Sequence, residues 1–182
     1  DTPDIENSDL GRVNVGYRTY FFVCNVPGPM FQSAELTLAD SSKKIDLLLN
    51  PLLPKAVQDY VNQSTRKPEI ILVWDVACDT LAAGETQSQF TLRLTTNNEQ
   101  GPELYTATVS YLNKPNILVS PEVGRPGDTF TIYACHFTPG QPITVDLYYG
   151  SDDKNENLDP IFYFSKHLTI PINEEGWGYL TI

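Results

Sequence analysis

The sequence predicts an all-β chain of two antiparallel sandwiches in tandem, with one short helix in the first. Residues 81–96 and 121–145 share one design, in which a glycine-containing corner precedes a strand of alternating apolar and polar residues. Alternation with a period of two buries one face of a strand and leaves the other in water, which is typical of antiparallel sandwiches. Apolar residues do not recur at helical spacing along these stretches, so helices are expected to contribute little to the fold.

A joint near residues 113–115 divides the chain into a first module, residues 1–113, and a second module, residues 114–182. A strand pattern ends at Asn113, Pro115 cannot continue a ladder of hydrogen bonds, and a new apolar run begins at Ile117. The second module is close to the smallest size at which a hydrophobic core is stable by itself. We therefore expect it to depend on its neighbour.

The first module is expected to follow a polar, acidic tail at residues 1–10 with a series of strands. Their apolar or alternating runs lie at residues 13–26, 35–38, 45–49, 70–78, 90–95 and 105–111. Residues 97–102 are expected to form a hairpin turn between the last two. Pro51 and Pro54 precede apolar residues at positions 56, 57, 60 and 61, a spacing that predicts the short helix at about residues 54–63.

The second module is expected to be built from the same kind of strand. Its apolar runs lie at residues 130–134, 143–147, 162–170 and 177–182. Strand alternation would place Phe137 on the opposite face from Phe130 and Ile132. A bulge near Cys135 or His136 is therefore expected if Phe137 also belongs to the core.

Two strands of the first module have apolar residues at both odd and even positions, so both faces of each strand must be covered. They lie at residues 17–26 and 70–78. One face of this pair is a candidate assembly surface, formed by Tyr20, Phe22, Cys24, Ile71 and Val73. Its cover could be the helix at 54–63, a neighbouring module or another copy of the chain. Asp75 is unusual in such a strand, because a carboxylate buried alone costs several kcal/mol, and it is expected to face a lysine, a bulge or water.

The charge of the chain argues against several classes of partner. The formal net charge is −11 and the pI is about 4.4. Phosphate backbones and anionic membrane surfaces are recognised by lysine and arginine, so nucleic-acid binding is disfavoured. No apolar run reaches the length of a membrane-spanning helix. The chain begins with Asp1, which suits either removal of a signal segment or a piece of a longer protein.

Three cysteines, Cys24, Cys78 and Cys135, have no zinc or redox spacing. Cys24 and Cys78 each end an apolar strand run, so a disulfide between them is conceivable. The alternative is that all three are small buried hydrophobic residues.

The first module resembles the DUF11-type repeat of prokaryotic surface proteins over about residues 17–112. The resemblance rests on features that follow one another along the chain. A first strand ends in Asn25, another strand is closed by Asp40, and the pair Leu53 and Pro54 comes next. Trp74 then lies on a strand that leads to the sequence LAAGE, and the sequence YTATVSY closes the module. The bulky Tyr20 and Phe22 depart from the threonine-rich outward face usual in that repeat. The resemblance implies an immunoglobulin-like sandwich.

The second module is similar to short bacterial immunoglobulin-like surface modules over about residues 117–182. The matching positions are Ser120, Pro121, Gly124, Gly127, Phe130, Ile132, Phe137, Pro139, Gly140, Ile143 and Trp177. This resemblance implies a spacer or adhesion module outside the cell. It supplies no catalytic residues.

Candidate chemistry in the sequence is sparse. His136 and His167 lie within strand patterns, and no hydrolase elbow, zinc-protease or phosphate-loop motif accompanies them. One loop carries side-chain oxygens at every second position, as a calcium loop does, at Asp153, Asn155, Asn157 and Asp159. It lacks the glycine and the final glutamate of a calcium loop. Aromatic residues of the second module, Tyr148, Tyr149 and Tyr163, are candidate contacts for sugar rings, with core packing as the alternative.

These features predict a non-enzymatic structural or adhesion module of a bacterial surface protein, located outside the cell and without a cofactor unless calcium binds. Its partners would be neighbouring modules or other copies of itself. One alternative is a subunit that assembles into a filament or surface layer by strand addition. Another is a carbohydrate-binding module attached to an enzyme.

Overall fold

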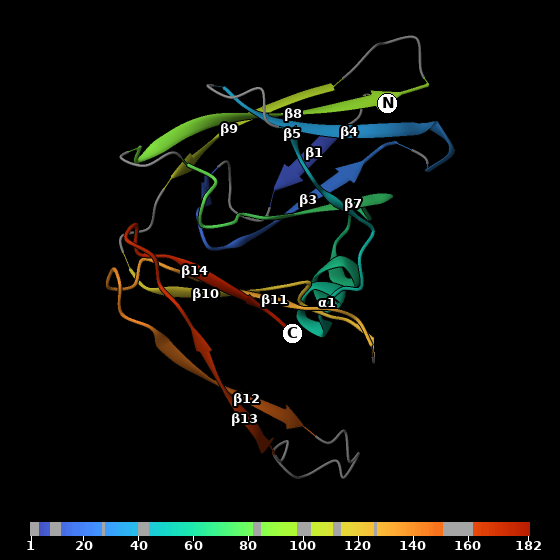
Figure 1. The fold of residues 1–182 in the computed structure, drawn as a ribbon. Helices are drawn as coiled ribbons and strands as arrows, with labels where there is room; N and C mark the ends of the chain where they lie inside the picture. The colour runs from blue at the N-terminus through green and yellow to red at the C-terminus, as the bar shows by residue number, and fades with distance from the viewer. Residues whose placement is uncertain are drawn as a thin grey trace.

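A computed structural model of the chain is mostly β, as the alternation predicts, and has one α-helix among the described residues (Figure 1). The residues that the structure describes are 4–7, 12–26, 28–39, 44–81, 85–97, 103–110, 114–125, 127–150 and 162–182. Every strand pair within them joins two strands on the same side of residue 113.

The first sheet of the first module has four antiparallel strands in the order β1-β3-β7-β6. Their bounds are β1 Asp4–Asn7, β3 Arg18–Cys24, β7 Ile70–Asp75 and β6 Leu48–Leu49. The two doubly apolar runs become β3 and β7, which are paired neighbours in the middle of the sheet. This position explains why both of their faces are apolar.

The second sheet has five strands in the order β2-β9-β8-β4-β5. Their bounds are β2 Arg12–Asn14, β9 Glu103–Ser110, β8 Gln87–Thr96, β4 Phe31–Leu38 and β5 Lys44–Ile45. A short 3-10 helix, η1 Gly28–Met30, precedes β4. Strand β2 runs parallel to β9, and the other pairs are antiparallel.

The strand expected at residues 13–26 is instead two strands in different sheets. β2 belongs to the second sheet and β3 to the first, and the chain turns between them at Gly16, whose φ is +82°. A side chain at Gly16 would be strained, and its Cβ would lie 3.0 Å from Sγ of Cys135. The run expected at 45–49 is likewise divided between β5 and β6.

The core between these two sheets contains sixteen buried residues of the described chain. Its centre is aromatic: the ring of Phe90 lies 5.0 Å from Trp74 and 6.0 Å from Phe21, with edge-to-face geometry in both pairs. Complete burial of a large apolar side chain contributes about 1.5–3 kcal/mol. The first module therefore has a substantial core of its own.

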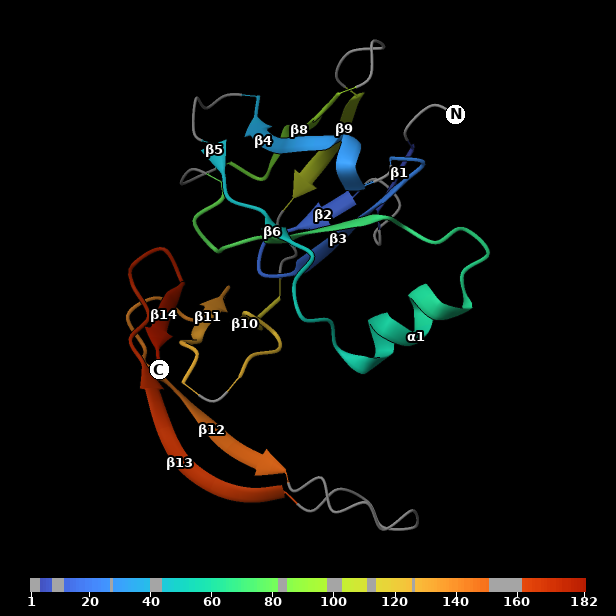
Figure 2. The same ribbon diagram turned by 90° about the vertical axis from the view of Figure 1, so that its right-hand side faces the viewer.

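Helix α1 (Lys55–Gln63) forms within the range that the proline pair predicts, with Pro54 at its N-cap. None of its residues is buried, and Figure 2 shows it set apart from the sheets at the end of the segment that leaves β6. Its ring contact to the first sheet joins Tyr60 to Phe22, with 5.5 Å between the ring centroids.

The second module packs a three-stranded sheet against a two-stranded ribbon. The sheet has the order β10-β11-β14, and the ribbon pairs β12 with β13. The bounds are β10 Asn116–Ser120, β11 Thr131–Cys135, β14 Gly178–Thr181, β12 Ile143–Gly150 and β13 Phe162–Ile170. Only five described residues form its buried core. Figures 1 and 2 show the ribbon extending away from the first module.

Candidate functional site at the junction of the modules

An arginine at the start of β3 makes three hydrogen bonds, two of which join the first module to the second. Arg18 pairs in register with Asp75 on β7, and its Nε lies 2.5 Å from the Asp75 carboxylate. Its Nη1 donates to Glu122 at 2.6 Å, and its Nη2 donates to the carbonyl oxygen of Val119 at 2.7 Å. Glu122 and Val119 belong to the second module, so one guanidinium binds both modules.

Asp75, the acidic residue in an apolar strand, has a partner in each module. Besides Arg18 it accepts a hydrogen bond from the hydroxyl of Ser120, the last residue of β10. The side chains of Arg18 and Asp75 are 9% and 12% exposed. Arginine takes the place of the lysine, bulge or water that the sequence suggested for Asp75.

The pKa values at this site follow from burial and from the two carboxylates. Burial by itself would lower the pKa of the Arg18 guanidinium, but the hydrogen bonds and negative charges of Asp75 and Glu122 outweigh it and raise the pKa. The hydroxyl of Tyr20 donates to Glu122 at 2.6 Å, and burial together with this bond raises the pKa of Tyr20. Arg18 thus stays charged and Tyr20 stays neutral at physiological pH.

A disulfide between Cys78 and Cys135 forms a second connection between the modules. The two Cα atoms are 5.4 Å apart, and the residues are 57 positions apart in sequence. Next to it, the side-chain amide of Asn116 donates to the carbonyl oxygen of Gly16.

The predicted disulfide between Cys24 and Cys78 is wrong, and the antiparallel register explains why. Cys24 follows Val23, which pairs with Ile70 at one end of the β3–β7 pair, whereas Cys78 follows the opposite end, where Arg18 pairs with Asp75. Two cysteines that each follow an antiparallel strand therefore lie at opposite ends of the pair. Cys24 carries a buried thiol.

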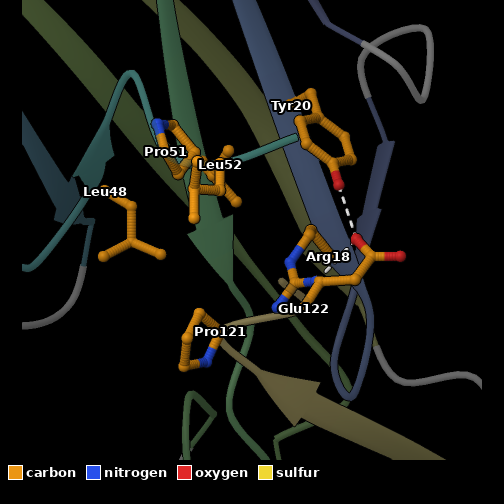
Figure 3. A pocket seen from close by; sticks show the side chains of 8 residues that line it. Arg18, Tyr20, Leu48, Pro51, Leu52, Pro121 and Glu122 are labelled. Atoms are coloured by element: carbon orange, nitrogen blue, oxygen red, sulfur yellow. Dashed lines mark hydrogen bonds and ion pairs between the residues drawn. The ribbon is translucent and has the colours of Figure 1, made fainter. Parts of the chain in front are cut away.

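A small notch, with room for about one water molecule, opens beside the Arg18 network (Figure 3). It is lined by Arg18, Tyr20, Leu48, Pro51, Leu52, Val73, Pro121 and Glu122. Its guanidinium, hydroxyl and carboxylate are hydrogen-bonded to one another, as the dashed lines in Figure 3 indicate. Charge-assisted hydrogen bonds of this kind hold two surfaces together.

The candidate assembly face lies on one side of the β3–β7 pair, and the chain itself covers much of it. Phe22, Cys24 and Val73 are buried, while Tyr20 and Ile71 are half-buried. Tyr20 stacks on Phe22 with 6.2 Å between the ring centroids, Tyr60 of α1 packs on Phe22, and Glu122 bonds Tyr20. Two of the covers that the sequence left open, the helix and the neighbouring module, are thus both used.

The other candidate residues belong to β12 and β13 or to the sequence between these two strands. Tyr149 pairs in register with Tyr163, and Tyr148 with Phe164, but their side chains lie outside the described part of the structure. The four calcium candidates, Asp153, Asn155, Asn157 and Asp159, also lie outside the described residues. The described residues contain no cluster of three or more histidine, cysteine or acidic side chains placed to hold a metal ion.

The two histidines have different surroundings. His136 follows β11 with a φ of +63°, at the place where the parity of Phe137 predicts a bulge. His167 lies on β13, and its Nδ1 is 2.6 Å from the Asp146 carboxylate on β12.

Sequence reasoning missed most of the junction. One signal was available, because Arg18 is the one basic residue within 13–26 and Asp75 is the one acidic residue within 70–78. Opposite charges in two doubly apolar strands indicate a cross-strand pair. Ser120 and Glu122 carry no such signal, since their role depends on how the modules dock.

Comparison with known proteins does not place the chain in a family. The sequence matches no protein-family model, and a search of curated proteins finds no relative. Within the described residues, no helix is long and apolar enough to cross a membrane.

Proposed function

We propose that this chain is a rigid pair of immunoglobulin-like sandwiches that serves, without enzymatic activity, as a structural and adhesive module of a bacterial surface protein outside the cell. The observation that carries the proposal is the double connection between the modules. A covalent bond, Cys78–Cys135, and a part-buried network around Arg18 both cross the joint.

The strand order of the first module supports its immunoglobulin-like character. With β1 and β2 taken as two parts of strand A (A and A′), β5 taken as C′ and the other strands lettered in chain order, the four-stranded sheet reads A-B-E-D and the other sheet reads A′-G-F-C-C′. These are the orders of the immunoglobulin sandwich. The module differs in that its buried tryptophan, Trp74, lies on β7, in the position of strand E.

The geometry of the two connections supports a rigid joint. Asn116 pairs with Cys135 at one end of β10 and β11, and Ser120 pairs with Thr131 at the other end. The disulfide holds the first end and Asp75 holds the second. A strand rises about 3.3 Å per residue, so the two attachments are about 13 Å apart. Two separated attachments oppose bending, whereas a single one would act as a pivot.

The cross-module disulfide also supports a location outside the cytoplasm. Disulfides persist in oxidising compartments and are rare where cellular thiols keep cysteines reduced. The net charge of −11 favours solubility and disfavours binding to nucleic acid.

Single-molecule stretching of the full chain, pulled from its two ends, tests the proposed double connection between the modules. With the disulfide intact, the chain between the two cysteines, which are 57 positions apart, is shielded from the force. In a Cys78→Ser/Cys135→Ser variant, complete unfolding should lengthen the chain by about 200 Å more, because each residue spans at most about 3.3–3.6 Å. A Cys24→Ala variant is the matched control and should unfold to the same length as the unmodified chain.

Two results would contradict the proposal. One is equal unfolded lengths for the unmodified chain and the double variant, which would mean that the modules are not crosslinked. The other is chemical turnover of a substrate by the purified chain.

A further inference from the structure

An open groove lies in the second module, on the segment that joins β13 to β14. It is lined by Pro171, Ile172, Asn173, Trp177, Gly178 and Tyr179. None of these residues takes part in the junction. The groove therefore needs an explanation of its own.

The turn that carries Trp177 is held by a dense set of hydrogen bonds. Oδ1 of Asn173 accepts from the backbone amides of Glu175 and Trp177, and the amide of Asn173 donates to the carbonyl of Trp177 at 2.9 Å. Gly176 has a φ of +83°, and its carbonyl accepts from the amide of Phe137. The backbone under the tryptophan is thus fixed before any ligand arrives.

The indole ring is oriented as well. Its Nε1 donates to the Glu175 carboxylate at 2.8 Å. A ring that is already fixed loses little conformational entropy on binding, which favours affinity. Trp177 is half-buried, so part of its surface contacts the turn and part remains accessible.

A second aromatic side chain lies two positions further along the chain. Tyr179 on β14 is 57% exposed, and it lines the same groove as Trp177, which lies just before the strand begins at Gly178. Its ring is 6.1 Å from that of Tyr133 on the neighbouring strand. The groove therefore presents consecutive aromatic surfaces rather than one.

Polar groups accompany these rings. Neither the amide nitrogen of Asn173 nor the hydroxyl of Tyr179 has a hydrogen-bond partner among the described residues, and Glu175 places a carboxylate at the edge of the indole. Rings that offer an apolar face, with donors and acceptors beside them, match the alternating C–H faces and hydroxyl edges of pyranose sugars.

The charge of the chain and the open shape of the groove limit the kinds of ligand that can bind. The acidic chain and Glu175 would repel a polyanion. A cationic ligand is bound best where ring faces surround it, whereas this groove is open and is lined by two aromatic side chains that stand two positions apart in the sequence. We propose that the groove binds a neutral oligosaccharide, with successive sugar rings stacked on Trp177 and Tyr179. The proposal names a ligand class for the adhesive module and so rests on the proposed function.

The test titrates the full-length chain with cellohexaose, xylohexaose, mannohexaose and chitohexaose, followed by calorimetry and by tryptophan fluorescence. The chain has two tryptophans, and Trp74 is 1% exposed, so a sugar that protects fluorescence from iodide quenching reports on Trp177. We expect at least one probe to bind saturably and to protect Trp177.

Three variants assign the binding to this groove. Trp177→Ala should weaken binding at least about tenfold, Tyr179→Ala should weaken it by a smaller factor, and Trp177→Phe should restore part of the loss. The matched control is Tyr60→Ala, because Tyr60 is also 57% exposed but lies on α1. It should leave the affinity unchanged.

Several results would overturn the proposal: no saturable binding by any of the four probes, equal affinity in Trp177→Ala, equal losses in Tyr179→Ala and Tyr60→Ala, or displacement of a bound sugar by tetramethylammonium. The stretching experiment does not involve the groove. A failed glycan site with a crosslinked junction would leave the structural role in place, and the two failures are therefore distinguishable.

Discussion

The pairing of Arg18 with Asp75 explains why an apolar strand can carry a carboxylate. An isolated carboxylate with 12% of its side chain exposed would be unfavourable, but a cross-strand guanidinium and a serine hydroxyl occupy its oxygens. Both partners lie at strand ends, where β3, β7 and β10 meet. The charge is tolerated because it is where the two modules touch.

Removing the arginine should be costly. Arg18→Leu leaves Asp75 buried without its cation, and the free energy of unfolding should fall by about 3 kcal/mol, since breaking a buried pair typically costs about 3–5 kcal/mol. The double variant Arg18→Leu/Asp75→Leu should recover much of this loss. Urea unfolding of both variants measures the difference.

A surface pair provides the matched control for this experiment. Lys44 and Glu35 are 3.0 Å apart, and their side chains are 73% and 47% exposed. Lys44→Leu should change the free energy of unfolding by less than about 1 kcal/mol. A loss in Arg18→Leu no larger than that in Lys44→Leu would show that the junction pair does not stabilise the fold.

His136 should make the fold less stable in mild acid. Burial lowers the pKa of His136 below its ordinary value of 6.5, so the unfolded chain binds this proton more readily than the folded chain. The stabilisation is complete above pH 6.5 and is lost as pH falls through the lower folded pKa. His136→Asn should reduce the loss of stability between pH 7 and pH 5, as measured by urea unfolding at each pH.

Asparagine is the suitable replacement because it tolerates the φ of +63° at this position. His167→Asn is the comparison, since that histidine is exposed and pairs with Asp146. An unchanged pH dependence in His136→Asn would contradict the prediction.

At the level of elements, periodicity predicted the strands and the helix better than their connections. The alternation at Phe90, Leu92 and Leu94 predicts β8, and the proline pair before residue 55 predicts α1. Periodicity does not show where a chain passes from one sheet to the other, so residues 13–26 resemble a single strand in sequence although the chain turns at Gly16. The cysteine prediction failed for a related reason, because it used strand ends without their direction.

Helix α1 should be the least stable regular element of the first module. None of its residues is buried, and its ring contact to the sheet is that of Tyr60 with Phe22. Tyr60→Ala should lower the free energy of unfolding by about 0.5–1.5 kcal/mol. Amide hydrogen exchange in residues 55–63 should accelerate more than exchange in β8, and equal acceleration in the two would contradict a local role.

At the level of the whole molecule, the junction could not be predicted from the sequence. Its contacts join residues about one hundred positions apart, such as Arg18 with Val119 and Asn116 with Gly16. No local pattern specifies such pairs, and only the small size of the second module indicated that it depends on the first. The five buried residues of its core are consistent with that expectation.

The disulfide should therefore decide whether the two modules unfold together. Closing a 57-residue loop stabilises a fold by about 4 kcal/mol in the chain-entropy account, and here that loop includes parts of both modules. The unmodified chain should melt in one transition. Cys78→Ser/Cys135→Ser should melt in two transitions, with hydrogen exchange assigning the earlier one to residues 114–182, whose core is the smaller.

Cys24→Ala, which removes a thiol outside this crosslink, should keep the single transition. One unaltered transition in the double variant would mean that the Arg18 network alone couples the modules, and that the disulfide is dispensable for their joint stability.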